Sequence, residues 1–152
     1  MISVENYNSI EEVLAEKGWF VSTISGVSMY PMLRNRKDQI LVKPVEGRLK
    51  PYDVALYHVG GSNVAHRVLE DCGDHYVIRG DNCMSKEIVP CADVVGVVTG
   101  FWRRGRFIEV TDRRYLRYAR FWVAVNPLVR LAHYPRIIAS KIYHGLSGKN
   151  SV

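Results

Sequence analysis

Short runs of apolar and β-branched residues recur along the first 110 residues, and some of them alternate with polar residues. Runs of this kind, bounded by glycine, proline, asparagine or aspartate, are typical of β-strands. They occupy residues 19–24, 39–43, 53–59, 63–69, 75–79, 94–99 and 106–110. Since this spacing differs from that of alternating β-α units, we expect a mainly β fold of coiled antiparallel sheets or a partly open barrel.

A short helix is predicted before the first strand. Residues Ser9-Ile-Glu-Glu12 have the capping-box pattern, and Gly18 supplies a helix stop. The helix should therefore run from Ile10 to about Lys17.

The pattern changes after residue 110. Asp112 is expected to cap a helix that Pro127 interrupts. A second helix is expected from Leu128 to about His144, with Pro135 breaking its middle.

The composition is that of a globular protein, since 47% of the residues are hydrophobic and 24% are charged. The net charge of +6 is unevenly spread: residues 1–100 contain 10 Lys and Arg against 13 Asp and Glu, whereas residues 101–152 contain 11 against 2. The sequence thus predicts a β domain with an N-terminal helix (residues 1–110) and a basic amphipathic helical tail (residues 111–152).

Cys72, Cys83 and Cys91 are odd in number and have no C-x-x-C spacing, which excludes a disulfide framework and a zinc site of the usual kind. We expect reduced thiols, although a Cys72–Cys83 bridge stays open. The first twelve residues lack a secretory signal, and no run of about 18 uninterrupted apolar residues occurs. The chain is therefore expected to be cytoplasmic, without a transmembrane segment.

Ser28 is the candidate nucleophile. It lies in Gly26-Val-Ser-Met-Tyr-Pro31, between the end of a predicted strand and a turn limited by proline. Such a turn can expose the hydroxyl and leave the backbone N–H available for an oxyanion. An ordinary turn explains the same motif.

His66 is the candidate general base, because a serine hydroxyl needs one at neutral pH. It lies within the apolar run Val64-Ala-His-Arg-Val68, on the side of the strand that Val64 and Val68 share. A structural histidine in the core is the alternative. No lysine is near this position, and Arg67 does not lose its proton in proteins.

Asp81 is the candidate acidic partner of His66. Gly80-Asp-Asn82 follows a predicted strand and is first of all a tight-turn pattern. In a catalytic triad, Asp81 would accept a hydrogen bond from His66 Nδ1 and fix the tautomer of the ring.

These motifs follow one another in the order found in a known family. The co-linear set comprises residues 26–33 (Gly-Val-Ser-Met-Tyr-Pro-Met-Leu), 38–42 (Asp-Gln-Ile-Leu-Val), 49–54 (Leu-Lys-Pro-Tyr-Asp-Val), 65–68 (Ala-His-Arg-Val), 76–82 (Tyr-Val-Ile-Arg-Gly-Asp-Asn) and 95–98 (Val-Gly-Val-Val). Over roughly residues 19–100 the chain resembles the type I signal peptidases, and within them the branch that uses a Ser–His pair. The resemblance implies a signal-peptidase-like β fold, Ser28 as nucleophile, His66 as base, Asp81 as acid, and neither metal nor organic cofactor.

The match has three departures. The family's N-terminal membrane anchor has no counterpart, so a soluble variant is expected. Gly26 stands where many bacterial members have a serine that supports the oxyanion hole, and Ser25 is one position away, so these two residues are assigned to support of the oxyanion hole and its turn. Further acids that follow Gly-Asp-Asn in the family are matched only loosely, by Glu87.

The basic tail interleaves arginines with aromatic residues between residues 101 and 122. Basic aromatic helices favour anionic lipid surfaces, which predicts peripheral membrane attachment. The alternative is a helix that packs its aromatics on the β domain and solvates its arginines. Nucleic acid is a less favoured partner.

The sequence thus predicts a serine endopeptidase that cleaves signal or leader peptides through an acyl-enzyme. The alternative hypothesis is a regulatory or binding module of the same fold that cleaves only itself or nothing. An adaptor function of the basic tail is the third.

Overall fold

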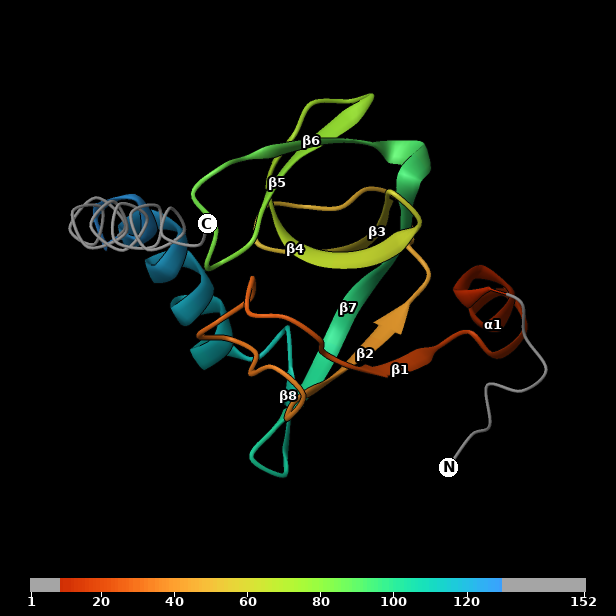
Figure 1. Ribbon diagram of the computed structural model, residues 1–152, viewed down its shortest axis with the longest axis horizontal. Helices are drawn as coiled ribbons and strands as arrows, with labels where there is room; N and C mark the ends of the chain where they lie inside the picture. The colour runs from red at the N-terminus through yellow and green to blue at the C-terminus, as the bar shows by residue number, and fades with distance from the viewer. Residues whose placement is uncertain (1–8, 130–152) are drawn as a thin grey trace, which may run out of the picture.

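The computed structural model describes residues 9–129, and its centre is an antiparallel sheet of eight strands that is not closed into a barrel (Figure 1). The strand order is β1-β2-β7-β3-β4-β5-β6, and β8 pairs with β7. The strands are β1 (Phe20–Thr23), β2 (Gln39–Lys43), β3 (Val54–Val59), β4 (Ser62–Asp71), β5 (His75–Arg79), β6 (Glu87–Pro90), β7 (Val94–Arg103) and β8 (Arg106–Glu109). The predicted mainly β antiparallel fold is confirmed.

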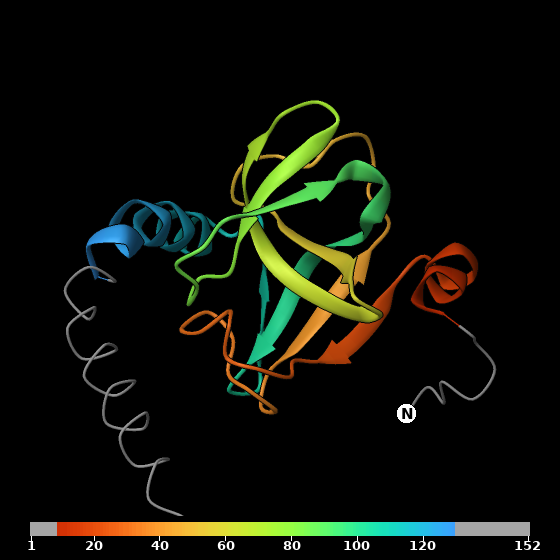
Figure 2. The ribbon, with the colours of Figure 1, turned by 45° about the horizontal axis from the view of Figure 1, so that its top comes forward.

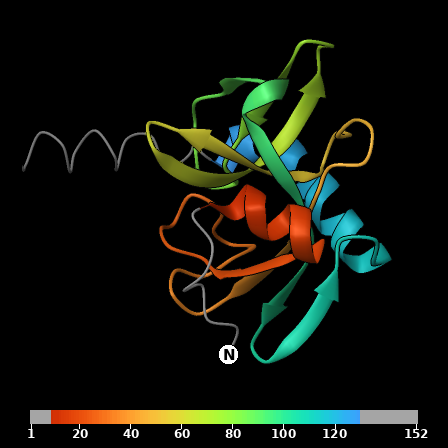
Figure 3. The same ribbon diagram turned by 90° about the vertical axis from the view of Figure 1, so that its right-hand side faces the viewer.

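The sheet is strongly curved because three of its strand pairs carry bulges. The register shifts between Leu41 and Val42 in β2, between Leu56 and Tyr57 in β3, and between Val68 and Glu70 in β4. Bulges bend strands and increase their twist. The sheet is accordingly curled (Figures 2 and 3), and the hairpin of β7 and β8 projects from it (Figure 3).

The β3–β4 hairpin fixes the position of the candidate base. Gly60 and Gly61 both have positive φ, of 53° and 81°, which suits a two-residue hairpin turn. The turn sets Val59 opposite Ser62, and the register then brings Ala55 opposite His66.

The N-terminal helix is α1 (Ile10–Lys17), as the capping box predicts. The Glu12 N–H donates to Ser9 Oγ, and Gly18 ends the helix with a φ of 75°. The predicted strands are all present with small differences at their ends. Strand β6 and the short 3-10 helix η2 (Cys91–Asp93) had no clear pattern in the sequence.

A C-terminal helix covers residues 113–129 of the described chain, at the opposite end of the sheet from α1 (Figures 1 and 2). Asp112 caps it, because its carboxylate accepts from the N–H groups of Arg114 and Tyr115. The predicted interruption at Pro127 is wrong: the helix continues through it. Packing of the preceding turns on the β domain holds the helix in place, as described below. The rest of the second predicted helix, including Pro135, lies outside the described residues.

The three cysteines lie within the described residues and form no disulfide, so the Cys72–Cys83 bridge is absent. Between residues 9 and 129, no helix is long and apolar enough to cross a membrane.

Candidate active site

Ser28 lies on the loop between β1 and β2, which is anchored at several points. The side chains of Met29, Met32 and Leu33 are buried directly after it. Further along, the buried Asp38 carboxylate accepts hydrogen bonds from the Arg34 backbone N–H and guanidinium. The loop therefore holds the half-buried Ser28 in one position.

Ser28 itself is tied to the turn that follows β5. Its carbonyl oxygen accepts a hydrogen bond of 2.6 Å from the Asn82 N–H. Among the described residues, neither the Ser28 hydroxyl nor its backbone N–H makes a hydrogen bond. Both groups that acyl transfer requires are thus available.

His66 lies in β4 with 5% of its surface exposed, on the buried side as predicted. Its Nδ1 is 2.9 Å from the Tyr57 hydroxyl and 3.1 Å from a carboxylate oxygen of Glu87. The Tyr57 hydroxyl in turn donates to the other Glu87 oxygen at 2.8 Å. The buried His66 Nε2 makes no hydrogen bond within the described chain.

This arrangement determines the tautomer of His66. Burial and Glu87 raise the pKa of the Tyr57 hydroxyl far above its ordinary value, so Tyr57 keeps its proton and donates it to Glu87. Both oxygens facing Nδ1 are then acceptors, and Nδ1 carries the proton. The lone pair is left on Nε2. Burial also lowers the pKa of His66, an effect that Glu87 and Asp81 partly oppose, so the ring is neutral at pH 7.

Gly80 is the point where the Ser28 loop and the His66 ring meet. A Cβ at this position would lie 2.8 Å from the Ser28 carbonyl oxygen and 3.1 Å from His66 Cδ2, the ring carbon bonded to Nε2. It would also lie 2.7 Å from Cys83 Sγ. Only glycine allows this approach, so the Ser28 backbone and the His66 ring lie against the same small residue, while the Ser28 hydroxyl and His66 Nε2 form no hydrogen bond in the described chain.

Asp81 does not make the predicted contact with His66. Its two carboxylate oxygens accept from Nε and Nη2 of Arg67, at 2.7 Å each. Successive residues of a strand point to opposite faces, and Asp81 lies on the Arg67 side of β4. A fully buried guanidinium requires a carboxylate, so Asp81 is engaged in an ion pair next to the candidate site.

Glu87 occupies the place assigned to Asp81 in the sequence. It begins β6, opposite Ile78 of β5. Its loose match to the acids after Gly-Asp-Asn was the only signal, because β6 had no clear strand pattern that would have placed it beside β5. The tight-turn interpretation of residues 80–82 fits the structure, since the Cys83 N–H donates to the Gly80 carbonyl oxygen.

Gly26 and Ser25 lie just before the nucleophile. Gly26 has a φ of 100°, and its N–H donates to the Asn35 side chain at 2.9 Å. A Cβ at Gly26 would meet nothing within 4 Å, so the backbone conformation accounts for the glycine. Ser25 is exposed and, like Ser28, lines a pocket.

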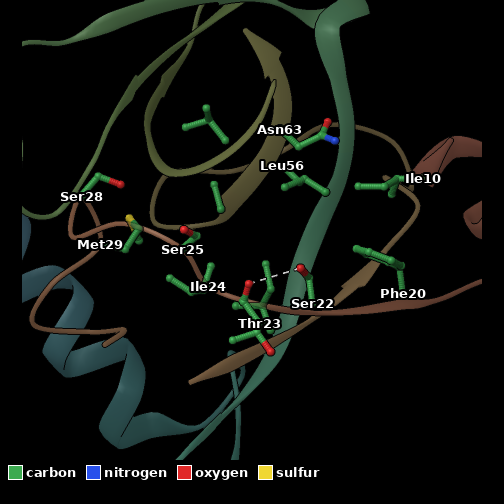
Figure 4. A pocket seen from close by; sticks show the side chains of 13 residues that line it. Ile10, Phe20, Ser22, Thr23, Ile24, Ser25, Ser28, Met29, Leu56 and Asn63 are labelled. Carbon is green, nitrogen blue, oxygen red and sulfur yellow. Dashed lines mark hydrogen bonds between the residues drawn. The ribbon is translucent and has the colours of Figure 1, made fainter. Parts of the chain in front are cut away.

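This pocket has a volume of about 310 Å³ and lies between β1 and the start of β4 (Figure 4). Its walls combine apolar side chains with the polar Ser22, Thr23, Ser25 and Asn63, and Ser28 stands at one end of it. The lining includes Ile10, Phe20, Ile24, Met29, Ile40, Leu56, Val64 and Ala65.

Both strands that flank the pocket have open edges within the described sheet. Strand β1 pairs only with β2, and β5 pairs with β4 only from Arg67 onward. Residues 62–66 of β4 are therefore unpaired on the side away from β3. The pocket can accept an extended chain that hydrogen-bonds to one or both edges.

Between residues 9 and 129, no group of three or more His, Cys, Asp or Glu side chains is arranged to hold a metal ion. No protein-family model matches the chain, and no curated protein matches it.

Proposed function

We propose that the protein is a serine endopeptidase of the signal-peptidase type, with Ser28 as nucleophile and His66 as general base. The observation that carries the proposal is the buried His66 ring, which holds its proton on Nδ1 and leaves Nε2 without a partner among residues 9–129. The Ser28 loop meets this ring at Gly80. An unpaired buried nitrogen is costly in a structural histidine, whereas a general base requires one.

The proposed reaction proceeds through an acyl-enzyme. His66 Nε2 takes the proton of Ser28 Oγ while Oγ attacks the scissile carbonyl carbon, and the Ser28 N–H stabilises the oxyanion. The imidazolium then donates its proton to the leaving amine as the peptide C–N bond breaks. Water, deprotonated by His66, hydrolyses the ester and regenerates Ser28.

Glu87 is the acidic partner in this scheme, with Tyr57 beside it. Its carboxylate accepts from both Tyr57 and His66 Nδ1, and so orients the ring and stabilises the imidazolium. Asp81 is a positioning residue: it pairs with Arg67 and carries the turn that holds Ser28.

The substrate that fits this site is an extended peptide added to the sheet between β1 and β4. The pocket is small for two neighbouring large side chains, which favours small residues before the cleaved bond. Signal or leader peptides are the proposed substrates, and the curved sheet is assigned to the signal-peptidase type of fold. A cytoplasmic leader-processing peptidase is the specific form of this proposal.

Digestion of a peptide library, analysed by mass spectrometry, tests the proposal. We expect the unmodified protein to cut after small residues and Ser28→Ala to leave the library intact. Ser85→Ala, which changes an exposed serine outside the lining of this pocket, should retain cleavage. A protein that cuts nothing, or a Ser28→Ala variant that cuts equally well, would overturn the proposal; peptide binding without cleavage would support the binding module instead.

Glu87→Gln should reduce kcat by about 10²–10⁴-fold, because the amide neither stabilises the imidazolium nor fixes the tautomer in the same way. Burial holds the pKa of His66 below its usual 6.5, so kcat/KM of the unmodified protein should persist below pH 6.5 and fall as the pH drops through that lowered pKa. Glu87 raises this pKa, and its replacement should therefore move the acid limb of the profile to lower pH.

The pH profiles of kcat and of kcat/KM measure the two effects, with Glu46→Gln as the control for loss of an exposed carboxylate. An unchanged kcat, or an acid limb that moves to higher pH, would remove Glu87 from the mechanism.

A further inference from the structure

The C-terminal helix has an inner face that fixes its orientation on the β domain. Trp122 Nε1 and the Asn126 side-chain amide both donate to the Asp81 carbonyl oxygen. The Tyr115 hydroxyl accepts from Arg67 at 3.0 Å, and Ala119 is fully buried. These residues recur at helical spacing, so the opposite face of the helix is held toward the solvent.

The outer face is strongly basic along its first two turns. Arg113, Arg114, Arg117 and Arg120 are all exposed, and none forms an ion pair within the described residues. No Asp or Glu occurs anywhere after Asp112 in the chain. A shallow pocket of about 350 Å³ is lined by three of these arginines and Leu116. No carboxylate in the part of the chain that the structure describes pairs with these arginines, although Arg120 lies over the Tyr52 ring.

The same outer face becomes apolar along its last turns. Phe121 is 64% exposed and Leu128 is 69% exposed, and a spacing of seven residues puts them on one side of the helix. Arg117 precedes Phe121 by one turn. The surface is therefore a cationic patch followed directly by two exposed large apolar side chains.

The combination of exposed arginines with two exposed apolar side chains favours one kind of binding partner over others. Phosphate groups of a nucleic acid would use the arginines but would leave Phe121 and Leu128 in water. A helix face that contacts only water would leave both apolar side chains exposed as well. Helices that lie in the interface of an anionic bilayer combine cationic residues with exposed apolar ones.

We propose that this outer face, formed by Arg113, Arg114, Arg117, Arg120, Phe121 and Leu128, binds the surface of an anionic lipid bilayer. The arginines contact the lipid phosphates, and Phe121 and Leu128 enter the boundary between headgroups and acyl chains. The aromatics Tyr115, Tyr118 and Trp122, which the sequence made equally plausible for lipid, instead face the β domain. Because the inner face binds Asp81, the surface lies on the element that also contacts the turn holding Ser28.

Co-sedimentation of the full chain with vesicles tests this proposal. The protein should bind vesicles of phosphatidylcholine with phosphatidylserine and should bind pure phosphatidylcholine much more weakly. Arg113→Gln/Arg117→Gln should weaken binding to the anionic vesicles by about 25-fold, from about fivefold for each arginine. Phe121→Ser/Leu128→Ser should weaken it as well, without changing the preference for anionic lipid.

Lys43→Gln/Lys50→Gln is the matched control, because it removes two exposed charges from other elements. Equal loss of binding in this control would mean that total charge, and not the outer face, is responsible. No binding to anionic vesicles, unchanged binding of Arg113→Gln/Arg117→Gln, or tighter binding to an oligonucleotide than to vesicles would overturn the proposal. Far-UV circular dichroism of each variant verifies that the helix is retained.

Discussion

His66→Gln should lower kcat/KM by about 10⁴–10⁶-fold for any peptide that the protein cleaves. The reason is that Ser28 Oγ remains protonated at neutral pH without a base, and His66 Nε2 belongs to the ring that meets the Ser28 loop at Gly80 and has no hydrogen-bond partner in the described chain. Glutamine retains a polar side chain beside Tyr57 and Glu87, but it cannot take up a proton. The loss should therefore appear in kcat, whereas peptide binding in the pocket should change little.

His58→Gln is the control for this experiment. His58 is an exposed histidine of the neighbouring strand β3, where it contacts Glu11 at the protein surface. This variant should cleave at the unmodified rate. If His66→Gln kept substantial activity while folded, as judged by its urea transition, His66 would be a structural core histidine and the proposed mechanism would be wrong.

The position of His66 follows from local rules that the sequence displays. Two adjacent glycines define the β3–β4 turn, and strand alternation then sets which residues share a face. Tyr57 lies two positions along β3 from Ala55, the residue opposite His66, and is therefore a diagonal neighbour of the histidine. The contact between Tyr57 and His66 therefore follows from the predicted β3–β4 hairpin.

The identity of the acid depended on long-range packing instead. Glu87 reaches His66 only because β6 pairs with β5, and β6 is a four-residue strand that ends in proline. The order of the motifs in the sequence allows Asp81 to pair with either His66 or Arg67. The buried guanidinium of Arg67 decides between them, because it pairs with Asp81, and Tyr115 of the C-terminal helix lies against the same guanidinium.

The second large effect concerns the Arg67–Asp81 pair, which is buried on both sides. Arg67→Met should lower the free energy of unfolding by about 3–5 kcal/mol, because Asp81 would remain as an uncompensated buried charge. The hydrogen bonds of Arg67 to the Tyr52 carbonyl oxygen and the Tyr115 hydroxyl would also be lost. Urea unfolding followed by tryptophan fluorescence measures the change, since Trp122 contacts Asp81 directly.

Two further variants separate the cost of leaving a buried charge unpaired from the cost of losing an ion pair as such. Arg48→Gln removes the Arg48–Asp71 pair, which is partly exposed, and should cost at most about 1 kcal/mol. Arg67→Met/Asp81→Leu removes both buried charges and should recover much of the stability lost in Arg67→Met, because apolar residues of similar volume can replace a buried pair. A double variant as unstable as Arg67→Met would show that the hydrogen bonds to Tyr52 and Tyr115, and not the charge on Asp81, dominate. Asp81 supplies no reacting group in the proposed mechanism. A double variant that folds should therefore keep cleavage that depends on His66. Any loss of its activity would measure how far the turn after β5 has moved the Ser28 loop.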